Sequence, residues 1–150
     1  MYPNSTITIN INVLSQDGAL LAACINAATL ALIDAGIPAS DYLVACTAGC
    51  SVGISRGPTH QPRSSATASL ADEVDDTLID LSGQEEQELP YLTIATLGAT
   101  DKVTVCMLEN RMNANRLEEV VNVAITGCKW IRAILDGVVR AQGEKMLEAG

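Results

Sequence analysis

Apolar and polar residues alternate strictly near the start of the chain. In residues 6–13 (TITININV), every second residue is a β-branched apolar one, and the residues between them are Thr or Asn. A period of two places alternate side chains on opposite faces of an extended backbone. The pattern predicts a strand with one buried face, formed by Ile7, Ile9, Ile11 and Val13.

The next segment, residues 19–35, is Ala-rich and predicts a helix. Asp17-Gly18 precedes it as a turn and helix-start signal, Gly36 supplies a left-handed stop, and Pro38 prevents continuation. Because the segment is apolar nearly all round, we expect a sheet and other helices to cover it on several sides. Asn26 is expected to bond to the backbone, as buried asparagines commonly do.

Small side chains dominate residues 41–54 (DYLVACTAGCSVGI), which predict a second strand. Small residues in a strand let a helix approach closely. Together with the preceding strand and helix, this segment completes a predicted β-α-β unit over residues 4–54.

Residues 55–90 break the regular pattern. They begin with a Pro/Ser/Thr-rich stretch and continue into an acidic one, with a single apolar run at residues 77–81 as a candidate strand. A loop this long inside a small domain is usually an insertion or a functional excursion. We therefore predict a loop insertion over residues 55–90.

A β-hairpin and a long helix are predicted to complete the chain. Residues 91–97 and 102–108 read as strands joined by a turn at residues 98–101, and the helix begins near Asn113. Its glycines weaken it and mark kinks or close packing. Apolar residues recur on one helix face: Leu117, Val120, Val121, Ala124, Cys128, Ile131, Leu135 and Val138. The predicted class is α+β, in a single domain over residues 1–150.

Composition adds two constraints to this pattern. Aromatic residues make up only 3% of the chain, with no Phe, so the core must consist of Ala, Val, Ile and Leu. The net charge of −9 argues against a chain that binds nucleic acid alone, because phosphate contacts need a basic surface. A role inside an assembly whose other subunits are basic stays open.

The candidates for chemistry are few. The five cysteines are odd in number and form no CxxC pair, so we interpret them as reduced, buried hydrophobes of an intracellular protein, with a reactive or metal-binding thiol as the alternative. His60 reads as a solvent-exposed loop residue. The acidic run is interpreted as solvated rather than as a cation site: Asp72, Glu73, Asp75 and Asp76. Met1-Tyr2-Pro3-Asn4 shows no signal-peptide pattern.

Residues 13–38 (VLSQDGALLAACINAATLALIDAGIP) carry a resemblance. The strand ending in Gln16-Asp17-Gly18, the Ala-rich helix, and its closing residues 34–38 resemble the RNase PH family. Residues 117–139 are similar to that family's last long helix. The resemblance is to the C-terminal half of the RNase PH-like ring subunits of the eukaryotic RNA exosome, closest to the type that corresponds to the catalytic subunit of the archaeal ring.

This resemblance implies a ribosomal protein S5 domain 2-like fold. It also implies a ring of six RNase PH-like domains that threads RNA from its 3′ end. Active members use inorganic phosphate to attack the terminal phosphodiester and release a nucleoside diphosphate. That chemistry needs an arginine pair in the first half of the domain, a hydroxyl at the helix start, and a carboxylate near the strand after the excursion.

The sequence departs from the family at each of these positions. Leu20 replaces the hydroxyl at the helix start, and an aliphatic side chain cannot donate a hydrogen bond. The segment directly before Tyr91 contains no Asp, and we expect Glu86 and its acidic neighbours Glu85 and Glu88 to lie too early, in a flexible loop. The arginine pair would precede Met1. We therefore predict no catalytic residue and a degenerate site formed by Asp17, Gly18, Ala19, Leu20 and Glu86.

Two further expectations concern RNA and the extent of the domain. Arg56 and Arg63 are the basic residues of the 55–90 loop and the candidates for RNA contact, although surface arginines that aid solubility are the simpler interpretation. The chain is predicted to lack the N-terminal half of its domain, as a fragment or truncated gene product would. An edge of the sheet would then be open at residues 6–13.

The function that the resemblance implies is that of a non-catalytic structural subunit of the exosome ring, in nucleus, nucleolus and cytoplasm. It would support 3′-to-5′ RNA processing and degradation, including rRNA maturation and mRNA turnover, by partner nucleases. The expected partners are other RNase PH-like subunits and S1/KH cap subunits, with no cofactor, metal or membrane. One alternative is an active phosphate-dependent exoribonuclease in which Glu86 or Glu88 replaces the family Asp. A self-associating domain without an RNA role is the other.

Overall fold

The computed structural model describes residues 5–39, 41–51, 77–98 and 100–149. Its elements are, in chain order, α1 (Leu20–Asp34), β1 (Leu43–Cys50), β2 (Thr77–Ile79), α2 (Gly83–Glu88), β3 (Tyr91–Leu97), β4 (Val103–Glu109) and α3 (Ala114–Ala149). The strands form one antiparallel sheet in the order β2-β1-β3-β4. The predicted α+β class is confirmed. In the described part of the chain, no helix combines the length and apolarity needed to cross a membrane.

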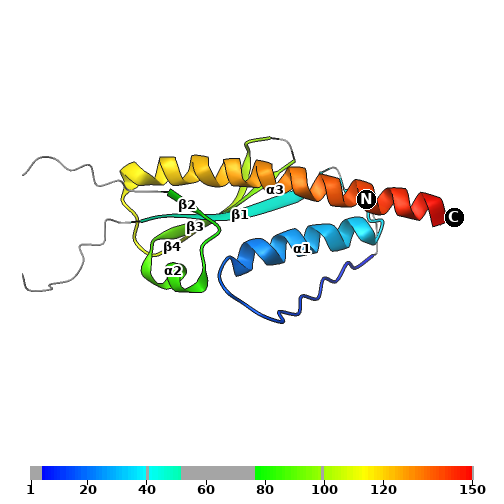
Figure 1. Ribbon diagram of the computed structural model, residues 1–150, viewed down its shortest axis with the longest axis horizontal. Helices are drawn as coiled ribbons and strands as arrows, with labels where there is room; N and C mark the ends of the chain where they lie inside the picture. The colour runs from blue at the N-terminus through cyan, green and yellow to red at the C-terminus, as the bar shows by residue number, and fades with distance from the viewer. Residues whose placement is uncertain (1–4, 40, 52–76, 99, 150) are drawn as a thin grey trace, which may run out of the picture.

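The inner strand β1 is covered on both faces. All of its residues except Leu43 are buried, because α1 packs on one face of the sheet and α3 on the other (Figure 1). Its neighbour β3 pairs with it along nearly its whole length, with Ala45 opposite Ala95 and Cys46 opposite Ile94. Two-sided cover explains why β1 is rich in small and apolar residues rather than alternating.

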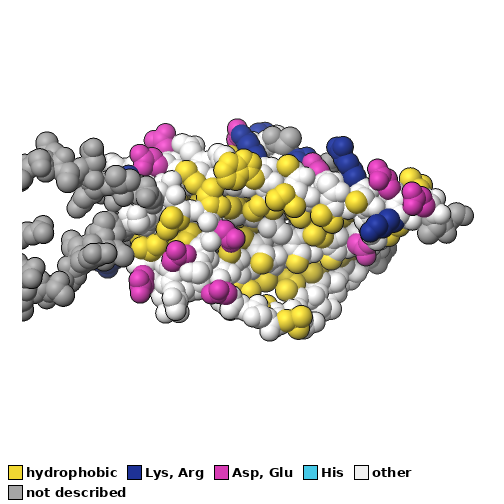
Figure 2. Space-filling model, in the orientation of Figure 1, with side chains coloured by type: hydrophobic (Ala, Val, Ile, Leu, Met, Phe, Trp, Pro, Cys, Tyr) yellow, Lys and Arg dark blue, Asp and Glu magenta, His cyan; other side chains and the backbone are white. Residues whose placement is uncertain are grey.

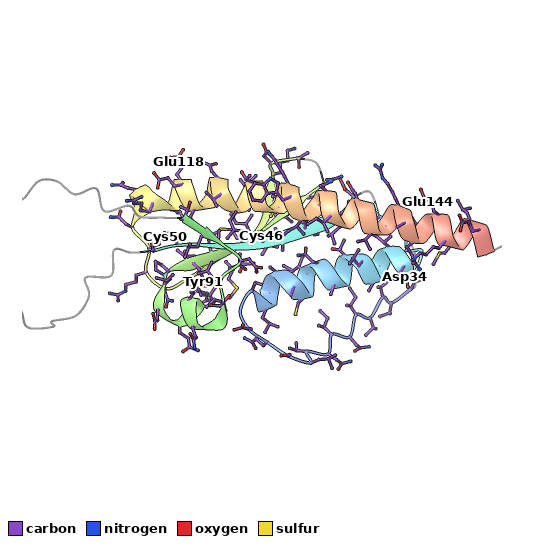
Figure 3. The ribbon with its side chains drawn as sticks, viewed as in Figure 1. Asp34, Cys46, Cys50, Tyr91, Glu118 and Glu144 are labelled. Atoms are coloured by element: carbon purple, nitrogen blue, oxygen red, sulfur yellow. The ribbon has the colours of Figure 1, made fainter. Side chains whose placement is uncertain are left out.

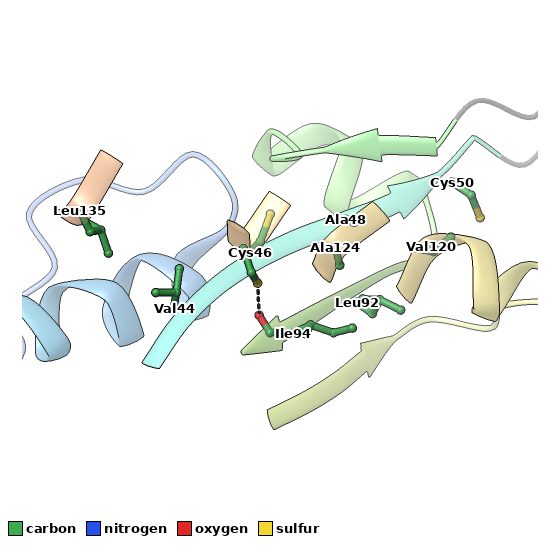
Figure 4. Close-up of a cluster of buried hydrophobic side chains, with 10 residues drawn as sticks. Val44, Cys46, Ala48, Cys50, Leu92, Ile94, Val120, Ala124 and Leu135 are labelled. Atoms are coloured by element: carbon green, nitrogen blue, oxygen red, sulfur yellow. Dashed lines mark hydrogen bonds between the residues drawn. The ribbon is translucent and has the colours of Figure 1, made fainter. Parts of the chain in front are cut away.

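The larger core lies between the sheet and α3 (Figure 4). Val44, Cys46 and Ala48 of β1 contribute to it, and the Cys128 thiol donates to the Ile94 carbonyl at 3.6 Å. The helical stripe predicted for α3 supplies the other side of this core, as expected. Its fully covered members are Val120, Ala124, Cys128 and Leu135, whereas Val138 is 53% exposed.

Close packing requires a glycine at one position of α3. A Cβ atom at Gly127 would lie 2.5 Å from the Cys46 Sγ, so the helix approaches β1 here more closely than an alanine allows. At Gly137 and Gly143 an added Cβ meets no atom within 4 Å. The helix runs unbroken through all three positions, so the prediction of close packing is confirmed at Gly127.

Helix α1 is less covered than the sequence led us to expect. Its buried residues are Ala22 and Thr29, and Ala22 packs against Ala45 and Ala95 of the sheet. The expectation of cover on several sides is wrong for the described residues, because α3 packs on the opposite sheet face and meets α1 only sparsely. The predicted stop is confirmed: the Gly36 N–H donates to the Ile33 carbonyl and the Ile37 N–H to that of Leu32, with Gly36 at φ +66°.

The predicted strand over residues 6–13 does not form. The segment is extended but unpaired, and its four apolar side chains are about half exposed: Ile7 51%, Ile9 46%, Ile11 48% and Val13 52%. A strand needs a neighbour for its backbone groups. None of the described strands pairs with this segment, so the predicted β-α-β unit is wrong in its first strand.

The 55–90 prediction is partly corrected. The candidate strand at residues 77–81 is confirmed as β2, but Gly83–Glu88 forms α2 instead of loop. Ser82 and Glu85 start this helix with a capping box, in which the Ser82 N–H donates to the Glu85 carboxylate at 2.8 Å. Residues 52–76 lie outside the described part of the chain, and the insertion stays a prediction. The hairpin and the C-terminal helix are confirmed.

Candidate functional site

The loop before α1 packs directly against the start of α2. Gly18 and Ala19 both have left-handed backbone, at φ +88° and +48°. A Cβ at Gly18 would collide with the Leu81 carbonyl oxygen, so only glycine permits this approach. The Asp-Gly pair that the sequence marked as a turn therefore brings α1 and α2 together.

Two hydrogen bonds join this loop to α2 in opposite directions. The Ala19 N–H donates to the Glu86 Oε1 at 2.8 Å, and the Gly83 N–H donates to the Asp17 Oδ1 at 3.2 Å. The first N–H groups of a helix have no partner within the helix and favour negative charge. Glu86 thus accepts one N–H group at the N-terminal end of α1, while Asp17 accepts one at the start of α2. The two carboxylates form what we call the reciprocal lock.

Two hollows adjoin the reciprocal lock. The larger, about 510 Å³, lies between the loop and α2, and the smaller, about 210 Å³, extends over the sheet to Met107 and Glu109 of β4. Three residues line both hollows, namely Gln16, Glu86 and Tyr91. Tyr91 starts β3 beside α2 (Figure 3). Glu86 thus lies in the wall that the two hollows share.

The charge of this site is negative. Its ionisable carboxyl groups belong to Asp17, Glu86 and Glu109, and among the described residues no Lys or Arg lines either hollow. The pKa of the Tyr91 phenol is raised above its usual value, first by burial and then by Glu86 and Glu109. The phenol is therefore a neutral donor near physiological pH. The site disfavours a free anion, because nothing in its lining offsets these carboxylates.

The structure brings together all the positions that the sequence marked as degenerate. Asp17, Gly18 and Ala19 form the loop before α1, and Leu20 lines the smaller hollow. Glu86 of α2 accepts the Ala19 N–H of this loop. The expectation that Glu86 lies in a flexible loop is wrong, because the capping box of α2 places it on a helix. Among the described residues, no group of three or more His, Cys, Asp or Glu has the geometry to hold a metal ion.

Other site residues were missed or lie elsewhere. Tyr91 and Glu109 come together only through the β3–β4 pairing, in which they are opposite each other. No local motif signals this, although the predicted hairpin implies it. The remaining candidates all lie outside the described residues: Arg56, His60, Arg63, Asp72, Glu73, Asp75 and Asp76.

The cysteines are mostly as expected. Cys46, Cys50 and Cys128 are buried, but Cys24 is only partly buried and Cys106 on β4 is exposed, which corrects the prediction for these two residues. Burial raises the pKa of Cys46 to about 12, with smaller contributions from Cys128 and Asp80. A thiol with such a pKa stays protonated and unreactive at neutral pH. Cys46 thus serves packing, not chemistry.

A second hollow region is apolar and lies far from this site. Helices α1 and α3 enclose a groove of about 470 Å³ between Leu30 and Ile33 on one side and Val138 and Met146 on the other. Figure 2 shows hydrophobic side chains gathered between the two helices on this face. Asp34 is the one carboxylate among the described residues that line this groove. The groove therefore offers a surface for hydrophobic packing and not a cluster of reactive groups.

The chain is similar to one protein family and to several known proteins. The family described as "3' exoribonuclease family, domain 1" matches residues 1–38. Exosome complex component ski6 of Schizosaccharomyces pombe is 38% identical over 147 residues, which is 98% of this chain and 52% of the relative. Exosome complex component RRP41 of Mus musculus is 35% identical over 141 residues, 93% of this chain and 49% of the relative.

A third relative gives the same picture. Exosome complex component SKI6 of Saccharomyces cerevisiae is 32% identical over 146 residues, covering 97% of this chain and 50% of the relative. The chain spans about half the length of the curated relatives it matches. Similarity of this kind extends across the described elements from α1 to α3.

Proposed function

We propose, from the premise that this chain belongs to the RNase PH-like family, that it serves as a non-catalytic structural subunit of an exosome ring. The relatives named above are exosome complex components, and they align with nearly the whole of this chain. Because the chain spans half of each relative, its place in a ring is carried over from them as a proposal.

One observation carries the non-catalytic part of this proposal. The site around Glu86 presents Asp17, Glu86 and Glu109, and the described residues that line it include no Lys or Arg. Phosphorolysis needs a bound phosphate dianion beside the phosphodiester that it attacks, and catalysis of phosphoryl transfer depends on positive groups that stabilise this charge. Leu20 at the first position of α1 adds no hydroxyl. The lining therefore supports assembly without catalysis.

The proposed partners are other RNase PH-like subunits and S1/KH cap subunits. The net charge of −9 supports a division of roles in which basic partner subunits hold the RNA. In that setting the chain supports rRNA maturation and mRNA turnover by partner nucleases in nucleus, nucleolus and cytoplasm. Arg56 and Arg63 remain candidates for RNA contact. Under the simpler interpretation, replacing both with Ala leaves RNA binding of the assembled ring unchanged, and a marked loss would favour contact.

The exposed segment at residues 6–13 supports a further part of the proposal. Its strict alternation is that of a half-buried strand, yet Ile7, Ile9 and Ile11 are about half exposed. We therefore propose that the segment pairs with a strand that the described residues do not supply. High solubility and a sharp thermal transition of residues 1–150 alone would contradict this idea.

The alternative function is phosphate-dependent exoribonuclease activity. The position of Glu86 favours it, because this carboxylate lines both hollows beside Tyr91, where a proton carrier would act. It would require arginines from a partner subunit and release of Glu86 from the Ala19 N–H.

Release of nucleoside diphosphate distinguishes the two functions. A short RNA is incubated with phosphate and either the purified chain or the complex isolated through it. We expect no nucleoside diphosphate that depends on this subunit: a complex carrying Glu86→Gln should release as much as one carrying the unaltered chain. Release from the purified chain, or a loss of release in the Glu86→Gln complex, would favour the alternative.

A further inference from the structure

Strand β4 is an open edge of the sheet. It lies last in the strand order β2-β1-β3-β4, and of the described strands only β3 pairs with it. Both of its faces are accessible, since the side chains of Val103, Met107 and Leu108 are 41%, 46% and 44% exposed. Cys106, at the middle of the strand, is exposed as well. An edge strand of this kind presents unpaired backbone groups to any further strand.

The hydrogen bonding of β3 shows which backbone groups of β4 point away from the sheet. The Gly98 N–H donates to the Tyr42 carbonyl, so even-numbered positions of β3 point toward β1 and odd-numbered positions point toward β4. The partners of those odd-numbered positions are odd-numbered in β4 as well, among them Met107. Because successive residues of a strand direct their backbone groups to opposite edges, Cys106 and Leu108 present theirs to the open side.

The charges around β4 lie at its two ends. Asp101 and Lys102 precede the strand, Glu109 closes it and Arg111 follows, whereas the residues between Lys102 and Glu109 carry no charge. An antiparallel second copy would bring the first pair of one chain to the second pair of the other. Each end of the paired strands would then hold two charges of either sign. Strand pairing is weakened by like charges directly opposite each other and supported by opposite ones, so this pattern of charges is complementary to itself.

We propose that β4 pairs antiparallel with β4 of a second copy of this chain, centred on Cys106, and thereby joins the two sheets into one. Cys106 is the midpoint of Val103–Glu109, so this register pairs both strands over their full length. Because its backbone groups point outward, Cys106 can pair with its own copy across a two-fold axis. The inference does not rest on the proposed ring function, since it concerns a copy of this chain and not another kind of subunit.

The oligomeric state of the full chain tests this assignment. Sedimentation velocity is measured over a range of concentrations for the unaltered chain, Cys106→Lys and Ile134→Lys. We expect the unaltered chain to dimerise. Cys106→Lys should raise the dissociation constant of the dimer by at least about tenfold, because two lysines would face each other at the axis. Ile134→Lys adds the same charge at a 66% exposed apolar residue of α3 and should leave the dimer unchanged.

A thiol crosslink identifies the strands that meet. In a hydrogen-bonded antiparallel pair the two Cα atoms are about 5.5 Å apart, so a short bismaleimide should join Cys106 of one copy to Cys106 of the other. Peptide mapping locates the link. Cys106→Ser should keep the dimer and lose the link, which separates strand pairing from the covalent bond.

A chain that stays monomeric at every concentration would overturn the proposal. A dimer that Cys106→Lys leaves unchanged, or one that is linked only through other thiols, would overturn it as well. If Cys106→Lys fails to fold, Leu108→Lys places the charge at the next outward position, and an unchanged dimer of this variant would then contradict the pairing. The measurement involves no other subunit, so its failure leaves ring membership untouched, and that membership is tested by the proteins that copurify with the chain.

Discussion

The side chain of Asn26 hydrogen-bonds to both backbone groups of Ala45, as a neighbouring strand would. Its Oδ1 accepts the Ala45 N–H at 2.8 Å, and its Nδ2 donates to the Ala45 carbonyl at 2.9 Å. Strand β2 pairs with β1 at residues 48–50, and none of the described strands lies beside this edge of β1 at Ala45. On the next turn of α1, the Thr29 hydroxyl donates to the Leu43 carbonyl at 2.9 Å. Helix α1 thus completes the hydrogen bonding of β1.

Replacing Asn26 should therefore destabilise the chain. Asn26→Ala leaves a buried N–H and a buried carbonyl without partners, which costs about 1–3 kcal/mol per group. The free energy of unfolding, from urea denaturation, measures the loss. Asn122→Ala, on the exposed side of α3, is the control and should change it by less than about 0.5 kcal/mol. Equal effects of the two substitutions would refute this role of Asn26.

The glycines of α3 offer a second comparison. Gly137→Ala should stabilise the chain by up to about 1 kcal/mol, because alanine favours a helix and meets no neighbour there. Gly127→Ala should destabilise it, because the new Cβ would lie 2.5 Å from the Cys46 Sγ. Thermal unfolding of both variants gives the signs.

A double substitution identifies the cause of the loss at Gly127. If the clash with the thiol is responsible, Cys46→Ala should make Gly127→Ala less harmful than it is in the unaltered chain. Additive effects of the two substitutions would place the cause elsewhere.

Thiol reactivity should follow burial. At pH 8 a small alkylating reagent should modify Cys106, which is exposed, well before Cys46 and Cys128, which are buried with raised pKa values. Peptide mapping after brief labelling locates the modified residues. Cys106→Ser should remove the fast fraction. Rapid labelling of Cys46 in the folded chain would contradict the packing described for it.

Raising the pH above 9 should destabilise the fold through the Cys46 thiol. The pKa of Cys46 is about 12 in the folded chain, against an ordinary value of 9.0. Between these values the unfolded chain has lost this proton and the folded chain retains it, so the contribution of Cys46 is complete below pH 9 and declines as pH rises toward 12. Unfolding free energies of the unaltered chain and Cys46→Ala above pH 9 should show the shallower decline in the variant.

Local patterns predicted those elements whose partners lie nearby or on a single face. The period of α3, the hairpin and the backbone bonds of Asn26 all followed from spacing or residue type. Residues 6–13 show the limit: alternation predicts which face of a strand is buried, but it does not supply the neighbour. In the part of the chain that the structure describes, no strand pairs with this segment.

The site was predictable in its residues but not in its geometry. The family resemblance marked residues 17–20 and Glu86 as degenerate positions. Their contact depends on a hydrogen bond across 67 residues, which no local signal encodes. The capping box at Ser82 and Glu85 is visible in the sequence, and it indicates α2. The acidic composition around it favoured the interpretation as a solvated loop.

Affinity capture of the tagged endogenous protein, read by mass spectrometry for partners and for its own peptides, tests the central claim most directly. We predict recovery of other RNase PH-like subunits together with S1/KH cap subunits. Recovery of the protein alone would contradict its proposed place in a ring.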